Sequence, residues 1–251
     1  MLREETVFGP IRSRRLGVSL GINLLPSDGK VCNFDCIYCE CGWNRDGAGG
    51  GPLPTAAEVR TALKSKLESL GDGCAEVDSI TFSGDGEPTL NPDFPQIIDD
   101  TLALRDEFCP GASVSVLSNA TRVDRPEIFR ALRKVDNPIM KIDAPTTALA
   151  ARINRPAPGY DVSLVVKSLE KFGGDFVLQT MFLRSELFDS SSSEVLGGWM
   201  DIVRTLKPRK VMVYTVDRPT PASGISKLSV GEMESLVKPL VGEGFDVSIY
   251  G

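Results

Sequence analysis

Histidine is absent from the 251 residues of this chain. A chain without histidine cannot build a Ser-His-Asp or Cys-His relay, an HExxH zinc site, or an iron site of two histidines and a carboxylate. Any chemistry that it performs must therefore use carboxylates, lysine, tyrosine, cysteine or a cofactor.

Long apolar runs are also missing. No stretch approaches the roughly 20 apolar residues that a membrane span needs, and residues 1–5 hold no apolar core of a signal peptide. We therefore expect a cytoplasmic protein with no membrane partner. Hydrophobic residues make up 41% and charged residues 25% of the chain. These fractions are those of an ordinary globular protein, so disorder and fibres are excluded.

An excess of positive charge is lacking as well. The 28 lysines and arginines are outnumbered by 34 aspartates and glutamates, which gives a net charge of −6. Nonspecific attraction to nucleic acid or to anionic lipid is therefore not favoured.

Short β-rich runs alternate with amphipathic helical stretches, which is typical of a parallel sheet. Strands are predicted at 18–24, 79–82, 113–117, 138–142, 176–182 and 210–216. Helices are predicted from Thr55 onward and at about 94–108, 126–135, 162–172, 193–206 and 230–241. We predict an α/β fold, a partial (β/α)6 TIM-type barrel of parallel strands. It forms a single domain over 1–251, with a core at about 16–220 and a C-terminal helix and strand at 229–250.

Four of the six cysteines lie within ten residues, at Cys32, Cys36, Cys39 and Cys41. We call residues 32–41 the Cys loop. The first three have C-x3-C-x2-C spacing, and three thiolates this close can hold one polynuclear centre, because thiolates select zinc, Cu(I) or iron–sulfur clusters. Three ligands on a four-iron cube leave one iron open for a substrate or cofactor.

A structural zinc site with Cys41 as fourth ligand is the non-enzymatic alternative. Such sites usually contain two separated CxxC pairs, and no second pair exists here. The two remaining cysteines, Cys74 and Cys109, are predicted to be buried apolar thiols rather than a disulfide.

The Cys loop, with Tyr38 directly before its last metal-binding cysteine, resembles the signature of radical S-adenosylmethionine (SAM) enzymes. Three later segments resemble other parts of that family, in the same order along the chain. Gly84-Asp85-Gly86-Glu87 resembles the family's Gly-Gly-Glu segment, with Asp85 in place of the first glycine. Asn119 resembles the family's Asn-containing turn, and Lys141-Ile142-Asp143 resembles its Lys-x-Asp segment.

The resemblance implies the cofactors and most of the site. Cys32, Cys36 and Cys39 would hold a [4Fe-4S] cluster, and SAM would chelate the open iron. The residues expected to bind SAM are Tyr38, Gly84, Asp85, Gly86, Glu87 and Asn119. Lys141 and Asp143 are expected to be catalytic, together with Gln179, which lies on a late strand. An internal ion pair of Lys141 with Asp143, and simple packing of Tyr38 beside the cluster, are the structural alternatives.

The implied reaction is reductive cleavage of SAM to a 5′-deoxyadenosyl radical, which abstracts hydrogen from a small molecule or peptide. Activation of a glycyl-radical enzyme is one alternative. Flanking segments resemble the small iron–sulfur oxidoreductases related to wybutosine synthases, which modify tRNA; these segments are 9–17, 21–23 and 154–156. Binding of tRNA would then be local, through Arg3, Arg12, Arg14 and Arg15. No second cluster motif is present, so we expect an external flavodoxin or ferredoxin to supply electrons.

Two expectations concern geometry. Cys39, Gly86, Asn119 and Asp143 should converge at one rim of the barrel, since all follow strands. The glycine-rich segment 47–51 should be poorly ordered or act as a lid.

Overall fold

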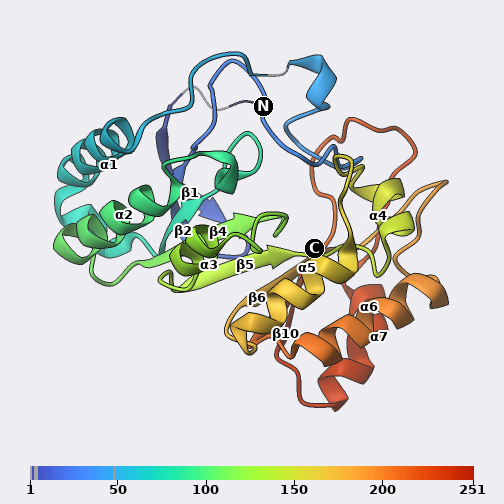
Figure 1. Ribbon diagram of the computed structural model, residues 1–251. Coiled ribbons are helices and arrows are strands. Elements are labelled where there is room, and N and C mark those ends of the chain that lie inside the picture. The colour runs from blue at the N-terminus through green and yellow to red at the C-terminus, as the bar shows by residue number, and fades with distance from the viewer. Residues whose placement is uncertain (1, 3–4, 48) are drawn as a thin grey trace. The chain divides into compact units, whose positions relative to one another are not determined.

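The computed structural model describes residues 2, 5–47 and 49–251, so Arg3 and Ala48 lie outside the described residues (Figure 1). The chain divides into two compact units of discontinuous segments. The first comprises Met1–Cys32, Asn44–Ser118 and Asp124–Pro138, and the second comprises Asn33–Trp43, Asn119–Val123 and Ile139–Gly251.

The first unit contains four strands in sequential order: β1 (Val7–Ser13), β2 (Gly17–Ile22), β3 (Ser79–Phe82) and β4 (Ser113–Ser118). β1 is antiparallel to β2, whereas β2, β3 and β4 are parallel. Every residue of β3 is buried, which is typical of a parallel strand covered on both faces.

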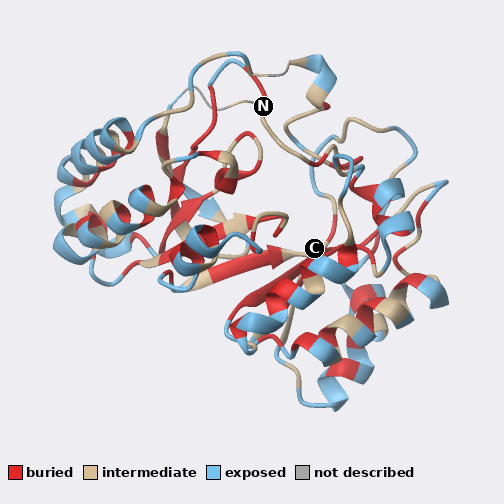
Figure 2. Ribbon diagram, in the orientation of Figure 1, coloured by how far each residue is buried: buried red, intermediate tan, exposed pale blue. Residues whose placement is uncertain are grey.

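The helices of the first unit are α1 (Ala56–Leu70), α2 (Phe94–Phe108) and α3 (Pro126–Leu132), with short 3-10 turns η1 (Asn44–Asp46), η2 (Gly71–Glu76) and η3 (Pro88–Leu90). α1 begins at a capping box, in which the Thr55 side chain accepts from the Glu58 amide and the Glu58 carboxylate accepts from the Thr55 amide. Its apolar stripe is buried (Figure 2), at Val59, Leu63 and Leu67.

The second unit contains a parallel set of strands in the order β5, β6, β8 and β10. Their bounds are Asn137–Lys141 (β5), Val177–Met181 (β6), Lys210–Tyr214 (β8) and Val247–Tyr250 (β10). Only the part of β5 from Ile139 onward belongs to this unit. Lys141 lies beside Gln179, and Gln179 beside Met212. Two short strands, β7 (Leu183–Arg184) and β9 (Ser226–Lys227), pair antiparallel.

The helices of this unit are α4 (Thr147–Ile153), α5 (Val162–Leu169, continued by the 3-10 turn η4, Glu170–Phe172), α6 (Ser193–Leu206) and α7 (Val230–Gly242). The core holds Trp199 of α6, whose ring packs edge-on against Phe182 at 5.2 Å between centroids. Its indole N–H donates to Thr180 Oγ1 at 2.9 Å, so the one polar atom of the buried ring is satisfied.

The predicted strands and helices are all present, with ends that differ by a few residues. The sequence analysis missed β1, α4 and the two-residue strands β7 and β9. β1 contains Gly9 and Pro10, and only its first two residues are buried, so it carries no apolar alternation. α4 has only seven residues, too few to show helical periodicity. No helix in the described part of the chain combines the length and apolar character that crossing a membrane requires.

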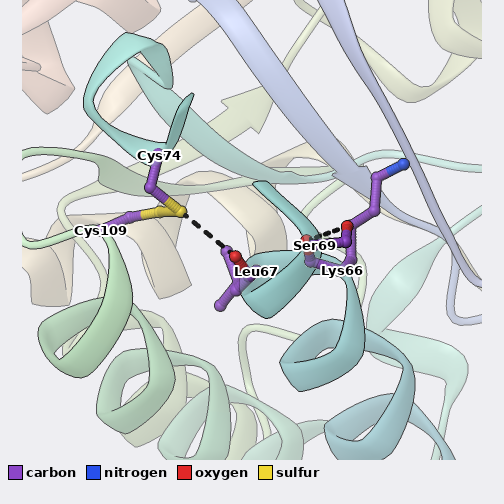
Figure 3. Close-up of a disulfide and its surroundings, with 5 residues drawn as sticks. All are labelled: Lys66, Leu67, Ser69, Cys74 and Cys109. Carbon is purple, nitrogen blue, oxygen red and sulfur yellow. Dashed lines mark hydrogen bonds between the residues drawn. A yellow bond between two sulfur atoms is a disulfide. The ribbon is translucent and has the colours of Figure 1, made fainter. Parts of the chain in front are cut away.

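The prediction for Cys74 and Cys109 was wrong in one respect. Both are buried, as expected, but they form a disulfide with a Cα–Cα distance of 5.2 Å. Figure 3 shows the bond beside the end of α1, with Cys74 Sγ 3.8 Å from the carbonyl oxygen of Leu67. Cys74 lies in η2 and Cys109 caps the end of α2, so tertiary packing brings together cysteines that are 35 residues apart.

Hydrogen bonds hold the described glycines of segment 47–51. The amides of Gly50 and Gly51 donate to Asp28 Oδ2 at 3.2 and 2.9 Å. Gly47 accepts from the Lys30 amide at 2.8 Å, and the amide of Gly49 donates to the Lys30 carbonyl at 3.4 Å. The structure therefore supplies anchors that the glycine content alone does not indicate.

Candidate active site

The Cys loop is fixed by backbone hydrogen bonds to the segment that ends α4. The amides of Asp35 and Ile37 donate to the carbonyls of Asn154 and Ile153, both at 2.9 Å. The amide of Ala157 donates to Asn33 at 2.8 Å. These bonds hold the Cys loop against residues 153–157, which gives its cysteines defined positions.

The four cysteines of the Cys loop form no disulfide among the described residues; Cys36 is buried and the others are half-buried. The Cys36 sulfur accepts hydrogen bonds from Lys141 Nζ at 3.1 Å and from Asn154 Nδ2 at 3.4 Å. No three Cys, Asp or Glu side chains among the described residues are arranged to hold a single metal ion. A four-iron cube has a different requirement, because each of its thiolates binds a different iron atom.

Lys141 and Asp143 form the centre of a buried polar network at the end of β5. Lys141 Nζ lies 3.1 Å from Tyr38 Oη and 3.7 Å from Asp143 Oδ2. The Asp143 carboxylate, whose side chain is fully buried, accepts from Tyr38 Oη, from Asn154 Nδ2 at 2.6 Å and from the Met181 amide at 2.9 Å. The internal ion pair weighed as an alternative is therefore present, and it contacts the Cys loop directly.

The electrostatics of this network fix two protonation states. Burial disfavours the charged form of Lys141, but the electrostatic interactions with Cys36 and Asp143 outweigh it and raise the pKa of Lys141 well above its usual value. Burial, together with the electrostatic interactions with Asp143 and Cys36, raises the pKa of Tyr38 well above that of an ordinary tyrosine. At neutral pH Lys141 is a cation and Tyr38 a neutral hydrogen-bond donor.

Gln179 lies beside Lys141 on the adjacent strand, so both side chains point to the same face of the sheet. Gln179 is 4% exposed, and its Nε2 has no hydrogen-bond partner among the described residues. A buried donor without a partner costs free energy, so this amide is available to a bound molecule. Asp217, which follows β8, is exposed.

Asn119 contacts the Cys loop within the second unit. Its Nδ2 donates to Asn33 Oδ1 at 2.7 Å, and Asn33 Nδ2 donates to Thr121 Oγ1 at 2.6 Å. Thr121 completes the ring by donating to Asn119 Oδ1, from its amide at 3.1 Å and its hydroxyl at 2.7 Å. Asn119 and Asp143 thus both lie against the Cys loop, as the sequence analysis expected.

The segment Gly84–Glu87 belongs to the first unit, and both of its carboxylates are buried. Asp85 Oδ2 accepts from Asn23 Nδ2 at 3.1 Å. Glu87 Oε1 accepts from the Thr89 hydroxyl at 2.6 Å and the Ser118 hydroxyl at 2.8 Å. Neutral donors thus contact both carboxylates and help to orient them.

The backbone conformation at Gly86 and the nearness of Val31 require a glycine at this position. Its φ is +147°, and a Cβ would come 1.8 Å from the carbonyl oxygen of Val31. The amide of Val31 donates to the Asp85 carbonyl at 2.9 Å, and the amide of Glu87 donates to the Val31 carbonyl at 3.1 Å. Gly86 thus permits the close approach of the residue that precedes Cys32.

The sequence analysis missed the role of Asn154. Its side chain donates to both Cys36 and Asp143, and its carbonyl accepts from Asp35. The Asn-Arg-Pro segment was noticed as a family-like feature, but its spacing from Cys36, 118 residues away, gave no signal of contact.

A sequence profile of the radical SAM superfamily matches residues 27–186. A protein named UPF0026 from Helicobacter pylori strain J99 is 28% identical over 97% of this chain and 75% of its own length. Among solved structures, a radical SAM methyltransferase from Sphaerobacter thermophilus has a TM-score of 0.70 and 17% identity, over 92% of this chain and 66% of that one. Streptococcus suis SuiB bound to S-adenosylmethionine has a TM-score of 0.65 and 15% identity, over 91% of this chain and 50% of that one.

These two structural matches confirm the predicted fold class, an α/β partial barrel of parallel strands. This chain spans half of the SuiB chain and about two thirds of the methyltransferase chain. The profile covers the Cys loop, the segment Gly84–Glu87, Asn119, Lys141, Asp143 and Gln179. From the match over most of its length it follows that the chain belongs to the radical SAM superfamily of enzymes, whose cofactors are a [4Fe-4S] cluster and S-adenosylmethionine.

Proposed function

We propose that this enzyme cleaves SAM reductively and uses the product to abstract hydrogen from a small-molecule or peptide substrate. The observation that carries the proposal is the contact of the Cys loop with the end of β5, where Cys36 and Tyr38 meet Lys141 and Asp143. It supports placing the Cys loop and the reacting groups at one site. The proposal takes the chain as a single domain of a cytoplasmic protein.

The donor chemistry of the Cys loop fits the cluster. Cys32, Cys36 and Cys39 form no disulfide among the described residues, and thiolates are the ligands that iron–sulfur clusters take. In the proposed site these three would hold the cluster, and Cys41 is not a ligand. When bound, the cluster supplies the electron that cleaves SAM to methionine and a 5′-deoxyadenosyl radical.

The chain's own residues orient and shield this chemistry. The hydrogen bonds of Asp35, Ile37 and Asn33 to the segment after α4 hold the Cys loop, and Asp143 fixes the phenol of Tyr38. Gln179 offers an unpartnered amide donor, so we assign it to the substrate, with Lys141 and Asp143 beside it.

The residues proposed to bind SAM come from three segments. They are Tyr38, Asn119 and the segment Gly84, Asp85, Gly86 and Glu87. Hydrogen bonds orient the side chains of Asp85, Glu87 and Asn119, which favours ready-made polar contacts for SAM.

A peptide or small molecule is favoured over tRNA as substrate. SuiB has also been solved with a precursor peptide, and the net charge of −6 opposes binding to a polyphosphate chain. The wybutosine-like assignment and tRNA remain the alternative, with phosphate contacts through Arg12, Arg14 and Arg15 of the N-terminal part. An external flavodoxin or ferredoxin would supply the electron, and activation of a glycyl-radical enzyme is a further alternative.

The test is SAM cleavage by the anaerobically reconstituted protein reduced with dithionite. We expect slow formation of methionine and 5′-deoxyadenosine without substrate. The rate should rise when the small-molecule or the peptide fraction of a cell extract is added, and the RNA fraction is the matched comparison.

Two results would contradict the proposal. Cluster-replete protein that forms no 5′-deoxyadenosine would refute the reaction, and stimulation by the RNA fraction alone would replace the proposed substrate class with tRNA. Gln179→Ala should weaken the stimulated rate more than the basal rate; an equal loss of both would move Gln179 to the SAM site.

A further inference from the structure

Two hydrogen-bond donors converge on one sulfur of the Cys loop. Lys141 Nζ lies 3.1 Å and Asn154 Nδ2 3.4 Å from Cys36 Sγ. The side chain of Lys141 is only 16% exposed, and Asn154 is 2% exposed. The Cys36 sulfur therefore lies beside a cation and an amide dipole. Because both are buried, water screens their electrostatic interaction with the sulfur only weakly.

Donors on a cluster sulfur change the stability of the reduced state. Reduction by one electron adds one negative charge to the cluster and its thiolates. A hydrogen bond to a ligand sulfur, or a cation beside it, stabilises that charge and raises the reduction potential. Backbone amides could serve this purpose, but here the two donors are side chains, which single substitutions can remove.

We propose that Lys141 and Asn154 are positioning residues that raise the reduction potential of the cluster through the Cys36 sulfur. This inference rests on the assignment of Cys36 as a cluster ligand in the proposed function. It gives Lys141 a role that does not require contact with substrate or SAM.

Asp143 acts in the opposite direction. Its carboxylate lies 3.7 Å from Lys141 Nζ and accepts from Asn154 Nδ2 at 2.6 Å, so it is one contact further from the sulfur than either donor. Its negative charge disfavours the added electron, and it also holds both donors in place. The potential is therefore set by a near cation and a more distant anion.

The experiment is an EPR-monitored redox titration of the reconstituted full chain without SAM. Lys141→Met should make reduction at least tenfold less favourable, which is about 59 mV for a one-electron couple. Asn154→Leu should shift the potential downward by less, because it removes an uncharged donor. Asp143→Asn should shift it upward, and Lys141→Arg should restore most of the wild-type value.

The matched control is Lys167→Met, which removes the same charge from an exposed position on α5 and should leave the potential unchanged. A general loosening of the site cannot produce shifts of opposite sign in Lys141→Met and Asp143→Asn. If Lys141→Met assembles no cluster, opposite shifts in Asn154→Leu and Asp143→Asn carry the same conclusion.

The inference is overturned if cluster-replete Lys141→Met and Asn154→Leu titrate like the wild type, or if Asp143→Asn shifts in the same direction as they do. Failure of the proposed function has different signatures. Full iron loading of Cys36→Ala would remove the ligand assignment, and absence of SAM cleavage would remove the reaction, while the titration of the wild-type cluster would still be measurable.

Discussion

The six cysteines of this chain fall into two groups with opposite surroundings. In the Cys loop, none of the four cysteines forms a disulfide with a described residue, and the buried one accepts hydrogen bonds from a lysine and an asparagine. In the first unit, Cys74 and Cys109 are joined in a disulfide between η2 and the end of α2. The same side chain is thus proposed as a cofactor ligand in one place and forms a covalent link in the other.

The two groups differ in how the sequence specifies a cofactor ligand and a disulfide. Cofactor ligands must meet on one centre, and placing them three or four residues apart on one loop achieves this locally. A disulfide constrains the unfolded chain most when its cysteines are far apart in sequence, so its partners carry no local pattern. The four predictions below separate the two groups, from the largest expected effect to the smallest.

The sharpest separation is iron binding. Changing Cys32, Cys36 or Cys39 to Ala should abolish the cluster, because each thiolate supplies one iron with its protein ligand. The measurement is iron and sulfide content with the visible spectrum after anaerobic reconstitution. Cys74→Ala is the matched control and should load fully; equal iron loss in both groups would erase the distinction.

The disulfide pair, by contrast, is expected to affect the free energy of unfolding. Removing the disulfide with Cys74→Ala and Cys109→Ala together should lower the free energy of unfolding by about 4 kcal/mol, because the link closes a separation of 35 residues. Denaturant titration with and without a thiol reductant measures this. Reductant should destabilise the wild type but not the double variant, and no effect on either would show that the link is not formed in solution.

Tyr38→Phe tests the network beside the free thiols. It removes the phenol that donates to Asp143, and the loss should lower the free energy of unfolding by about 1–2 kcal/mol with iron content unchanged. Tyr250→Phe, at a half-buried position on β10, is the control and should change little. Loss of iron in Tyr38→Phe would mean that the network is needed to assemble the cluster.

The smallest effect is expected for the fourth cysteine of the loop. Cys41→Ala should keep the cluster and change the free energy of unfolding by no more than about 0.5 kcal/mol, because three thiolates suffice for a cube with one open iron. Metal analysis of the purified variant provides the measurement. Loss of bound metal would instead support the zinc site with Cys41 as its fourth ligand.

The sequence by itself determined the fold class and most of the elements. Local signals carried this: the capping boxes at Thr55 and Ser229 begin α1 and α7, and short apolar runs mark β3 and β8. The spacing of the Cys loop likewise indicated its chemistry, because that pattern lies within eight residues.

The tertiary structure alone decided which groups meet. It joined Cys74 to Cys109, brought Asn154 to the Cys36 sulfur, and left Gln179 Nε2 without a hydrogen-bond partner among the described residues. Each depends on segments that are far apart in the sequence. Periodicity and spacing report only what neighbouring residues do, whereas a contact across more than thirty residues depends on how the whole chain packs.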